Sequence, residues 1–356
     1  MGIEKIQKRL IEEEKDVLLV TNIKNIRYLT GFSGSTALLL VEPENSFILL
    51  DSRYTEQAKE EIYKNIEIVH INSNRTYYDF ILERKNKKGW KRFCFEGRHL
   101  SYSDWVKWKD LLDDCELIST EDWIEDLRAV KTEEEIEKIK RALDIAEKAL
   151  EKVLTLIKPK IKEKDVALEL EYQMIKLGAE KPAFDTIVAS GYRSAMPHGV
   201  ASNKEILPQE FIVLDFGACY QGYNSDITRT VYLGTPQEDE LLYYNIVLEA
   251  QKRAEEVVKE GLELKFVDGV ARSIIEENGY GEYFGHGLGH GVGLDIHEKP
   301  RLAPKVEGFL KESMVVTIEP GIYFPKKFGI RIEDMIVVRK EKGEVLNKFP
   351  KELIIL

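Results

Sequence analysis

Short hydrophobic runs alternate with amphipathic stretches along the first third of the chain. The runs have the length of strands, and they are residues 17–20, 36–42, 46–51, 66–71 and 92–97. The stretches between them carry hydrophobic residues at helical spacing, and they are residues 3–14, 54–63, 76–85 and 102–113. Strands that alternate with helices in this way predict an α/β domain.

The pattern changes between residues 119 and 132. Thr132 and Glu135 have the spacing of a capping box, which predicts the start of a long helix. The second part of the chain then combines predicted helices with predicted strand pairs. The helices are residues 132–157, 162–178, 237–260 and 265–278, and the strands are 185–190, 211–219, 224–233, 314–323 and 330–339. Antiparallel strand pairs covered by helices are typical of an α+β domain. We therefore expect an α/β domain over residues 1–125 and an α+β domain over residues 126–356.

The first predicted strand pair, FIVLDFGACYQGYNSDITRTVYL, carries two acidic residues among hydrophobic ones. If the chain folds back between Tyr220 and Gln221, Asp215 lies opposite Asp226. Like charges that face each other on neighbouring strands are destabilising, so this pair would need a proton or a cation. A single pair of this kind is also compatible with two charges at the protein surface.

The second predicted strand pair, VVTIEPGIYFPKKFGIRIEDMIVV, repeats the arrangement. Folding about Lys326 places Glu319 opposite Glu333. Because two strand pairs show the same conflict between charge and hydrophobic surroundings, a shared cation becomes the better explanation.

Histidines alternate with glycines in FGHGLGHGVGLDIHE, residues 284–298. Five glycines within nine residues disfavour a helix. The period of two predicts a strand with His286 and His290 on one face and almost no side chains on the other. A glycine-rich loop with histidines that are merely polar is the alternative.

His290 and the four carboxylates together form a ligand set of hard oxygen donors and one imidazole. That set suits Mn²⁺, Co²⁺, Fe²⁺ or Zn²⁺. Four carboxylates exceed the needs of one divalent ion, so two ions that share bridging carboxylates are expected.

Charge and composition exclude several classes of partner. The formal net charge of −11 disfavours nucleic acid and anionic membrane surfaces, which both need basic patches. No run approaches the ~20 hydrophobic residues needed to span a bilayer, and no hydrophobic signal core opens the chain. The three cysteines have no CxxC spacing, so a disulfide framework is not expected and the cytoplasm is the expected compartment.

At these residues the sequence resembles the proline-specific pita-bread metallopeptidases, namely Xaa-Pro aminopeptidase (aminopeptidase P) and Xaa-Pro dipeptidase (prolidase). HGLGHGVGLDIHE resembles their histidine signature, and PHGV, LDFGA, NSDITRT, TIEPGIY and RIED follow the family's order. NIRYLTGFSGSTALLL, residues 25–40, resembles the family's N-terminal domain. The resemblance implies a creatinase-like N-terminal domain over 1–125 and a pita-bread catalytic domain over 126–356.

The resemblance also implies a role for each candidate ligand. Asp226 and Glu333 would bridge two divalent ions, most readily Mn²⁺ or Co²⁺, with Zn²⁺ or Fe²⁺ also suitable. His290 and Glu319 would complete the shell of one ion, and Asp215 would hold the other. A hydroxide that bridges the ions would then attack the scissile carbonyl.

Other residues would act on the substrate, a short peptide with proline in its second position. Glu319 would take and return the proton, His297 would stabilise the oxyanion, and His198 would contact the substrate near the scissile bond. His286 would line the proline pocket or support the site from behind. Arg301 would pair with the carboxylate of short substrates, while Arg331 could orient ligand carboxylates.

The resemblance implies a homodimer in which the N-terminal domain narrows a neighbour's active-site mouth. It leaves the choice between dipeptides and longer peptides open. Two alternatives remain. Removal of N-terminal methionine is the first, although enzymes of that class usually lack such an N-terminal domain. A non-catalytic peptide-binding module is the second, although such modules typically lose the metal ligands.

Overall fold

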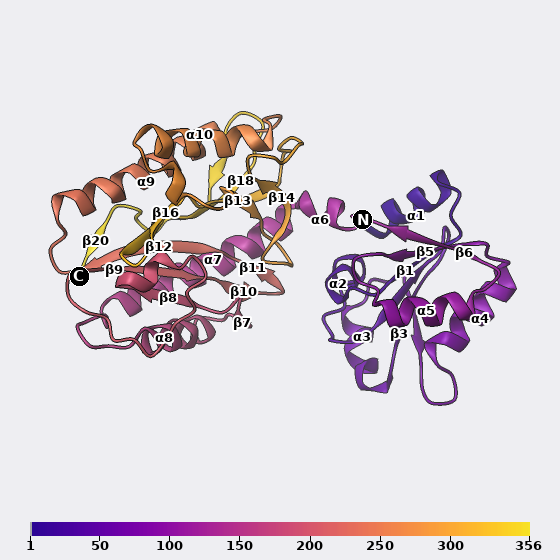
Figure 1. The fold of residues 1–356 in the computed structure, drawn as a ribbon. Helices are drawn as coiled ribbons and strands as arrows, with labels where there is room; N and C mark the ends of the chain where they lie inside the picture. Colours follow the sequence, from indigo (N-terminus) through magenta and orange to yellow (C-terminus); the bar gives the residue numbers. More distant parts are fainter. Residues whose placement is uncertain (1) are drawn as a thin grey trace. The chain divides into compact units, whose positions relative to one another are not determined.

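The computed structural model describes residues 2–356, and the chain divides into two compact units after Arg128 (Figure 1). The first unit is built on a six-stranded sheet with the order β4-β3-β2-β1-β5-β6. Its strands are β1 (Val17–Val20), β2 (Leu38–Val41), β3 (Ser46–Leu50), β4 (Glu67–His70), β5 (Arg92–Glu96) and β6 (Glu116–Thr120). Its helices are α1 (Gly2–Glu12), α2 (Ile23–Thr30), α3 (Thr55–Glu61), α4 (Tyr77–Lys88) and α5 (Tyr102–Leu111), and the short α6 (Glu125–Ala129) crosses the division.

Successive side chains of a strand point to opposite faces of the sheet, and in the first unit both faces carry a hydrophobic layer. Leu18 and Val20 pack with residues of α1 and α2, whereas Val17 and Leu19 pack with residues of α4 and α5. The predicted α/β architecture is confirmed. Helix α2 was not predicted; Asn22 caps its start, and its end is marked by Gly31 in the left-handed conformation (φ 83°).

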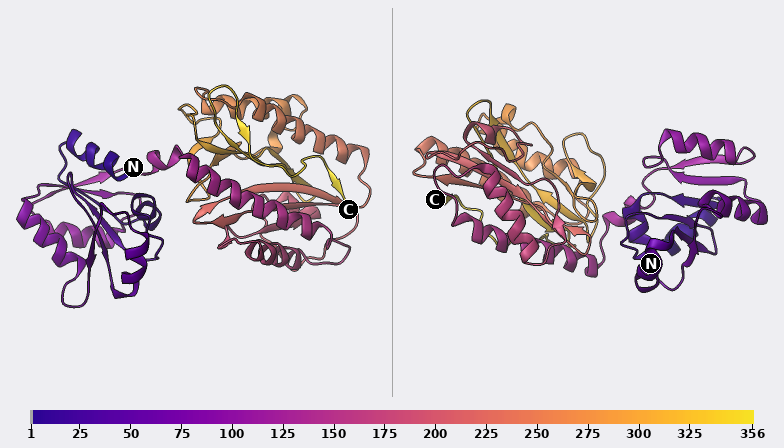
Figure 2. Two further views of the ribbon diagram at one scale, coloured as in Figure 1. Left: turned by 180° about the vertical axis from the view of Figure 1, so that it is seen from behind. Right: turned by 90° about the horizontal axis from the view of Figure 1, so that it is seen from below.

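The second unit, Ala129–Leu356, places sheets of mainly antiparallel strands between two pairs of helices (Figures 1 and 2). One pair is α7 (Glu133–Leu154) with α8 (Glu163–Lys176), and the other is α9 (Glu238–Val257) with α10 (Leu264–Glu277). Thr132 opens α7 through the expected capping box with Glu135. The unit is α+β, as predicted.

The sheets of the second unit are formed by short strands. One sheet has the order β20-β12-β9-β8, another has the order β14-β13-β15-β18-β19, and two smaller ones contain β11-β10-β7 and β16-β17. The first sheet and its neighbour contain β7 (Lys181–Pro182), β8 (Ile187–Ser190), β9 (Glu210–Phe216), β10 (Ala218–Tyr220), β11 (Tyr223–Asn224), β12 (Ile227–Leu233) and β20 (Ile354–Ile355). The others contain β13 (Gly289–Gly291), β14 (Glu298–Leu302), β15 (Val315–Ile318), β16 (Gly321–Phe324), β17 (Phe328–Arg331), β18 (Asp334–Val337) and β19 (Glu344–Val345).

The first acidic strand pair has a different register from the one predicted. Asp215 lies opposite Thr228, not opposite Asp226. The cause is the turn, which consists of Gln221 and Gly222, both with positive φ (47° and 81°). Two left-handed residues form the tight turn that suits a hairpin, and this moves the fold point by one residue. Asp226 is therefore a diagonal neighbour of Asp215 on the same face.

The second acidic strand pair has the predicted register. Ile318 pairs with Asp334 and Gly321 pairs with Arg331, so Glu319 and Glu333 lie at matching positions between these pairs. The predicted strands are not continuous, however. Each strand of the two acidic pairs is divided in two: the first is broken at Gly217, and the breaks in the other three include Asp226, Glu319 and Glu333. Acidic residues are poor strand formers, which fits their place in these breaks.

The glycine–histidine segment forms a much shorter strand than predicted. Only Gly289–Gly291 pairs, as β13, while His286 lies in the irregular chain before it. Tight packing fixes the short strand: a Cβ atom on Gly289 would lie 2.0 Å from the Thr317 oxygen, and one on Gly291 would lie 2.1 Å from the Lys299 oxygen. The bare face therefore does admit neighbouring backbone, as expected.

Candidate metal centre

Three residues that lie in or directly before three different strands bring their ligand atoms together. Atoms of Asp226, His290 and Glu333 lie within 4.8 Å of one another. Asp226 immediately precedes β12, His290 is the middle residue of β13, and Glu333 immediately precedes β18. A bridge between Thr228 and Glu333 joins the two sheets at this point.

His290 presents one ring nitrogen to the neighbouring carboxylates. Its Nδ1 lies 3.1 Å from the Gly291 carbonyl oxygen, which can only accept, so Nδ1–H donates there. Its Nε2 lies 3.3 Å from Glu319 Oε1 and 3.6 Å from Asp226 Oδ2. A backbone acceptor on one ring nitrogen orients the other as a ligand.

Asp215 and Glu319 complete the carboxylate cluster. Glu319 follows β15, and its Oε1 accepts a hydrogen bond of 3.2 Å from the Thr317 hydroxyl. Asp215 lies near the end of β9 and accepts a hydrogen bond from the buried Arg331 guanidinium. All five candidate ligands line one cavity of about 640 Å³.

Burial and mutual repulsion disturb the acid–base properties of the cluster. Burial raises the pKa of Asp226 and of Glu333 well above the ordinary range, and the neighbouring carboxylates raise both pKa values further. Burial likewise raises the pKa of Glu319, and it lowers the pKa of His290.

Glu333 has a buried oxygen atom that can bind a cation. Its Oε2 accepts a hydrogen bond of 2.6 Å from the Thr228 hydroxyl, whereas its Oε1 is buried without any partner among residues 2–356. A buried acceptor of this kind is costly unless something binds it. Hard carboxylate oxygens, one imidazole nitrogen and an unpartnered oxygen fit divalent cations.

The remaining candidate residues surround the cluster. His198, His286, His297 and Arg301 all line the cavity. The His297 ring centroid is 4.3 Å from that of His290, and burial lowers the His297 pKa. His198 and Arg301 are exposed, and Arg301 is paired with His290 across β13 and β14.

His286 is tied into a network that sequence reasoning largely missed. Its Nε2 lies 3.0 Å from the Tyr323 hydroxyl, which also accepts a hydrogen bond of 2.7 Å from Arg331 Nη1. Arg331 therefore joins Tyr323 to Asp215. The RIED motif contains Arg331 and the TIEPGIY motif ends at Tyr323, but nothing in the sequence indicated that these two side chains contact each other.

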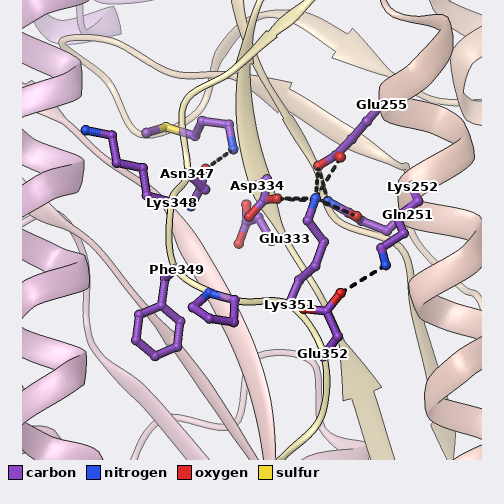
Figure 3. Close-up of polar contacts among 12 residues, drawn as sticks. Gln251, Lys252, Glu255, Glu333, Asp334, Asn347, Lys348, Phe349, Lys351 and Glu352 are labelled. Carbon is purple, nitrogen blue, oxygen red and sulfur yellow. Dashed lines mark hydrogen bonds and ion pairs between the residues drawn. The ribbon is translucent and has the colours of Figure 1, made fainter.

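A second buried network lies beside Glu333, and Figure 3 shows the part of it in which Lys351 contacts Asp334 and Glu255. Arg229, on β12, donates from Nη1 to the Glu333 carbonyl at 2.6 Å and from Nη2 to Asp334 Oδ1 at 2.7 Å. Lys351 Nζ lies 2.6 Å from Asp334 Oδ2 and also contacts Glu255 on α9. The C-terminal segment therefore helps to fix the backbone that carries Glu333.

Comparison with known proteins accounts for almost the whole chain. Residues 137–340 match metallopeptidase family M24, and residues 3–130 match the creatinase/prolidase N-terminal domain. An uncharacterized peptidase of Bacillus subtilis, YqhT, is 41% identical over 358 residues, with 100% of both chains covered. The Xaa-Pro dipeptidase of Pyrococcus furiosus is 43% identical over 353 residues, with 99% of both chains covered.

Solved structures agree with this assignment. A Xaa-Pro dipeptidase from Bacillus anthracis has a TM-score of 0.96 at 44% identity, with 100% of this chain and 99% of that one covered. An X-Pro aminopeptidase from Thermotoga maritima has a TM-score of 0.91 at 41% identity, with 98% and 99% covered. The chain thus belongs to metallopeptidase family M24 and combines a creatinase-type N-terminal domain with the pita-bread catalytic domain that its motifs had led us to expect.

Proposed function

We propose that the protein is a metal-dependent Xaa-Pro dipeptidase, which hydrolyses the bond between an N-terminal residue and a following proline. The observation that carries the proposal is the convergence of Asp226, His290 and Glu333, with the unpartnered Glu333 Oε1, inside a cavity large enough for a dipeptide. Two relatives at 43% identity that are named Xaa-Pro dipeptidase support the substrate class.

The proposal assigns the metal to the five clustered residues. Asp226 and Glu333 would be shared by two divalent ions, with His290 and Glu319 on one side and Asp215 on the other. When bound, such ions lower the pKa of a water molecule and polarise a carbonyl group. The protein side chains would hold the ions in a buried site of low dielectric constant.

Glu319 is assigned the proton transfer. Its carboxylate lines the cavity, where it could take a proton from the attacking water and return it to the product, and burial raises its pKa. Thr317 holds Oε1 by a hydrogen bond of 3.2 Å, so the direction of the carboxylate is fixed before substrate arrives.

His297 and His198 are assigned contacts with the substrate. Burial lowers the pKa of His297, so this ring is neutral at pH 7, and its N–H can stabilise the developing oxyanion without the cost of a buried cation. His198 lies at the cavity wall, where it would contact the peptide near the scissile bond. The His286 ring, which is hydrogen-bonded to the Tyr323 hydroxyl, lines the same cavity.

Proline is favoured for a physical reason. The Xaa-Pro bond has no N–H, and the pyrrolidine ring needs an apolar surface. The cavity wall supplies Phe184, Ile187 and Ile296. Arg301, exposed at the same cavity, would pair with the carboxylate of the proline, and this contact would select dipeptides over longer chains.

A substrate comparison tests the proposal. Metal-loaded protein should cleave Met-Pro faster than Met-Pro-Ala-Ala and should leave Met-Ala-Ser intact. Faster cleavage of the longer proline peptide would reassign the protein as an aminopeptidase P. Preferred cleavage of Met-Ala-Ser would remove the requirement for proline.

We further propose that the active form is a homodimer, as the family resemblance implies. Sedimentation at the concentration used for the assay should give the mass of two chains. Full activity in a monomer would contradict this part of the proposal.

A further inference from the structure

The segment from Gly191 to Ser202 brings His198 to the cavity. It begins with the short helix η2 (Gly191–Ala195) and contributes Pro197, His198 and Val200 to the cavity wall. Within residues 2–356, no hydrogen bond of the His198 side chain is found, and this side chain is exposed. The position of His198 must therefore be set by the backbone of its segment.

Glu163 anchors Ser190, directly before this segment, and Ser202, its last residue. It lies in the first turn of α8, outside the residues that line the cavity, and is 0% exposed. Its Oε1 accepts hydrogen bonds from the Ser190 backbone N–H (2.8 Å) and hydroxyl (3.0 Å). Its Oε2 accepts them from the Ser202 backbone N–H (3.2 Å) and hydroxyl (2.7 Å).

Arg193 links Glu163 to the middle of the segment through hydrogen bonds. Its Nη1 donates to Glu163 Oε2, and its Nη2 donates to the Val200 carbonyl at 2.9 Å. The Val200 N–H in turn donates to the His198 carbonyl at 2.9 Å. A short chain of hydrogen bonds therefore runs from Glu163 to the backbone of His198.

The cavity side of the segment is held as well. Arg331 Nη1 donates to the Pro197 carbonyl at 3.3 Å, and the Gly329 N–H donates to the Ser194 hydroxyl at 2.8 Å. Buried charge-assisted hydrogen bonds of this kind are strong, and loss of one acceptor leaves buried donors without partners. Glu163 is thus placed to decide whether the segment holds one conformation.

We propose that Glu163 is a positioning residue for the peptidase reaction, which acts by fixing His198 at the substrate cavity. The inference rests on the proposed function, because it assumes that His198 contacts the substrate. It predicts that Glu163 affects substrate turnover through His198 and leaves the metal ligands undisturbed.

The test is a double-mutant cycle with E163Q and H198A, assayed on Met-Pro with bound metal. E163Q should lower kcat/KM by about tenfold to a hundredfold in the native background, but by less than about twofold when His198 is already absent. D165N is the matched control, because Asp165 is an exposed acid in the same turn of α8 and should leave kcat/KM unchanged. Metal content should be the same in all variants.

Equal losses from E163Q in both backgrounds would overturn the proposal, as would a loss of bound metal. If E163Q does not fold, S202A removes one hydroxyl donor to Glu163 and should show the same dependence on His198 with a smaller loss. Hydrogen exchange of the amides of residues 190–202 needs no substrate. If the wild-type protein proves inactive, the proposed function fails, yet faster exchange in E163Q than in D165N would still support the anchoring, and unchanged exchange would overturn it.

Discussion

The Thr228 hydroxyl lies between two residues of the metal centre. It donates to Glu333 Oε2 at 2.6 Å and accepts from Arg331 Nε at 3.2 Å. One oxygen of Glu333 is therefore held in place while the other remains available to a cation. Such outer contacts fix the direction of a metal-binding carboxylate.

Substitution of Thr228 by valine should weaken metal binding with little change in volume. We expect the affinity for Mn²⁺ to fall about 10- to 100-fold, because Glu333 loses its only hydroxyl donor in the described part of the chain. Calorimetric titration of the metal-free protein measures this. T186V is the control, since the buried Thr186 hydroxyl has no hydrogen-bond partner in residues 2–356. Equal affinity in T228V and the wild type would contradict the role given to Thr228.

The charged residues of the site could be predicted from the sequence more easily than the residues that contribute hydroxyl groups. Asp226 and Glu333 stood out because a carboxylate inside a hydrophobic strand conflicts with its surroundings. Thr228 and Tyr323 did not, since both residue types are common in strands. Their roles depend on which side chains lie across the sheet, and a single strand contains no information about that.

At the scale of elements, strand register depended on turn chemistry. The register of Glu319 and Glu333 followed from simple symmetry about Lys326, and the structure has it. The register of Asp215 did not follow from the same symmetry. Gln221 and Gly222 both adopt left-handed backbone conformations, and the turn is centred on them rather than between Tyr220 and Gln221. Gly222 was the available signal, since a glycine in a two-residue turn is typical of hairpins.

The glycines around His290 differ in the space that surrounds the position of an added Cβ atom. Alanine substitutions at a crowded glycine and at an open one therefore form a matched pair. G289A places a Cβ 2.0 Å from the Thr317 oxygen, whereas G285A meets no atom within 4 Å. We expect G289A to destabilise the second unit by about 1–3 kcal/mol and to lose bound metal, because β13 must move. Thermal melting and metal analysis measure both effects. A G289A protein as stable and as metal-rich as G285A would show that β13 does not need this close approach.

The contact between α9 and the C-terminal segment should make stability depend on pH. Burial raises the pKa of Glu255 to about 7 from 4.5, and the nearby Asp334 carboxylate adds to the increase. Because the folded pKa is the higher one, the stabilising contribution is complete below about pH 4.5 and is lost as the pH rises through about 7.

Replacement of Glu255 by glutamine should remove this dependence. Relative to E255Q, the wild-type protein should lose stability between pH 5 and 8, by at most about 1.4 kcal/mol for each pH unit. Urea unfolding of both proteins at each pH measures the difference. E249Q, an exposed change on the same helix, should show no such trend. A pH-independent difference between the wild type and E255Q would contradict the raised pKa.

At the scale of the whole molecule, each unit has its own hydrophobic core. Two clusters draw on residues 3–127 alone, and another draws on residues 129–353 alone. Periodicity was enough to predict both fold classes, because it reports which faces are buried. It could not predict the parallel pairing of β20 with β12, which brings the end of the chain back beside a strand more than a hundred residues earlier.

Metal should stabilise the two units unequally. The clustered ligands all belong to the second unit, where bound cations would remove repulsion among buried carboxylates. Hydrogen exchange with and without Mn²⁺ should therefore show added protection after Ala129 and little change before Arg128. Equal protection in both units would mean that the effect of the metal is not local to this cluster.

The most direct test of the account is the hydrolysis of Met-Pro by protein stripped with a chelator, before and after addition of Mn²⁺ or Co²⁺. The account predicts no hydrolysis without metal, recovery of activity on addition, and no recovery in H290A. Hydrolysis by the stripped protein, or recovery in H290A equal to that of the wild type, would contradict the assignment of this carboxylate and histidine cluster as the centre of a metallopeptidase.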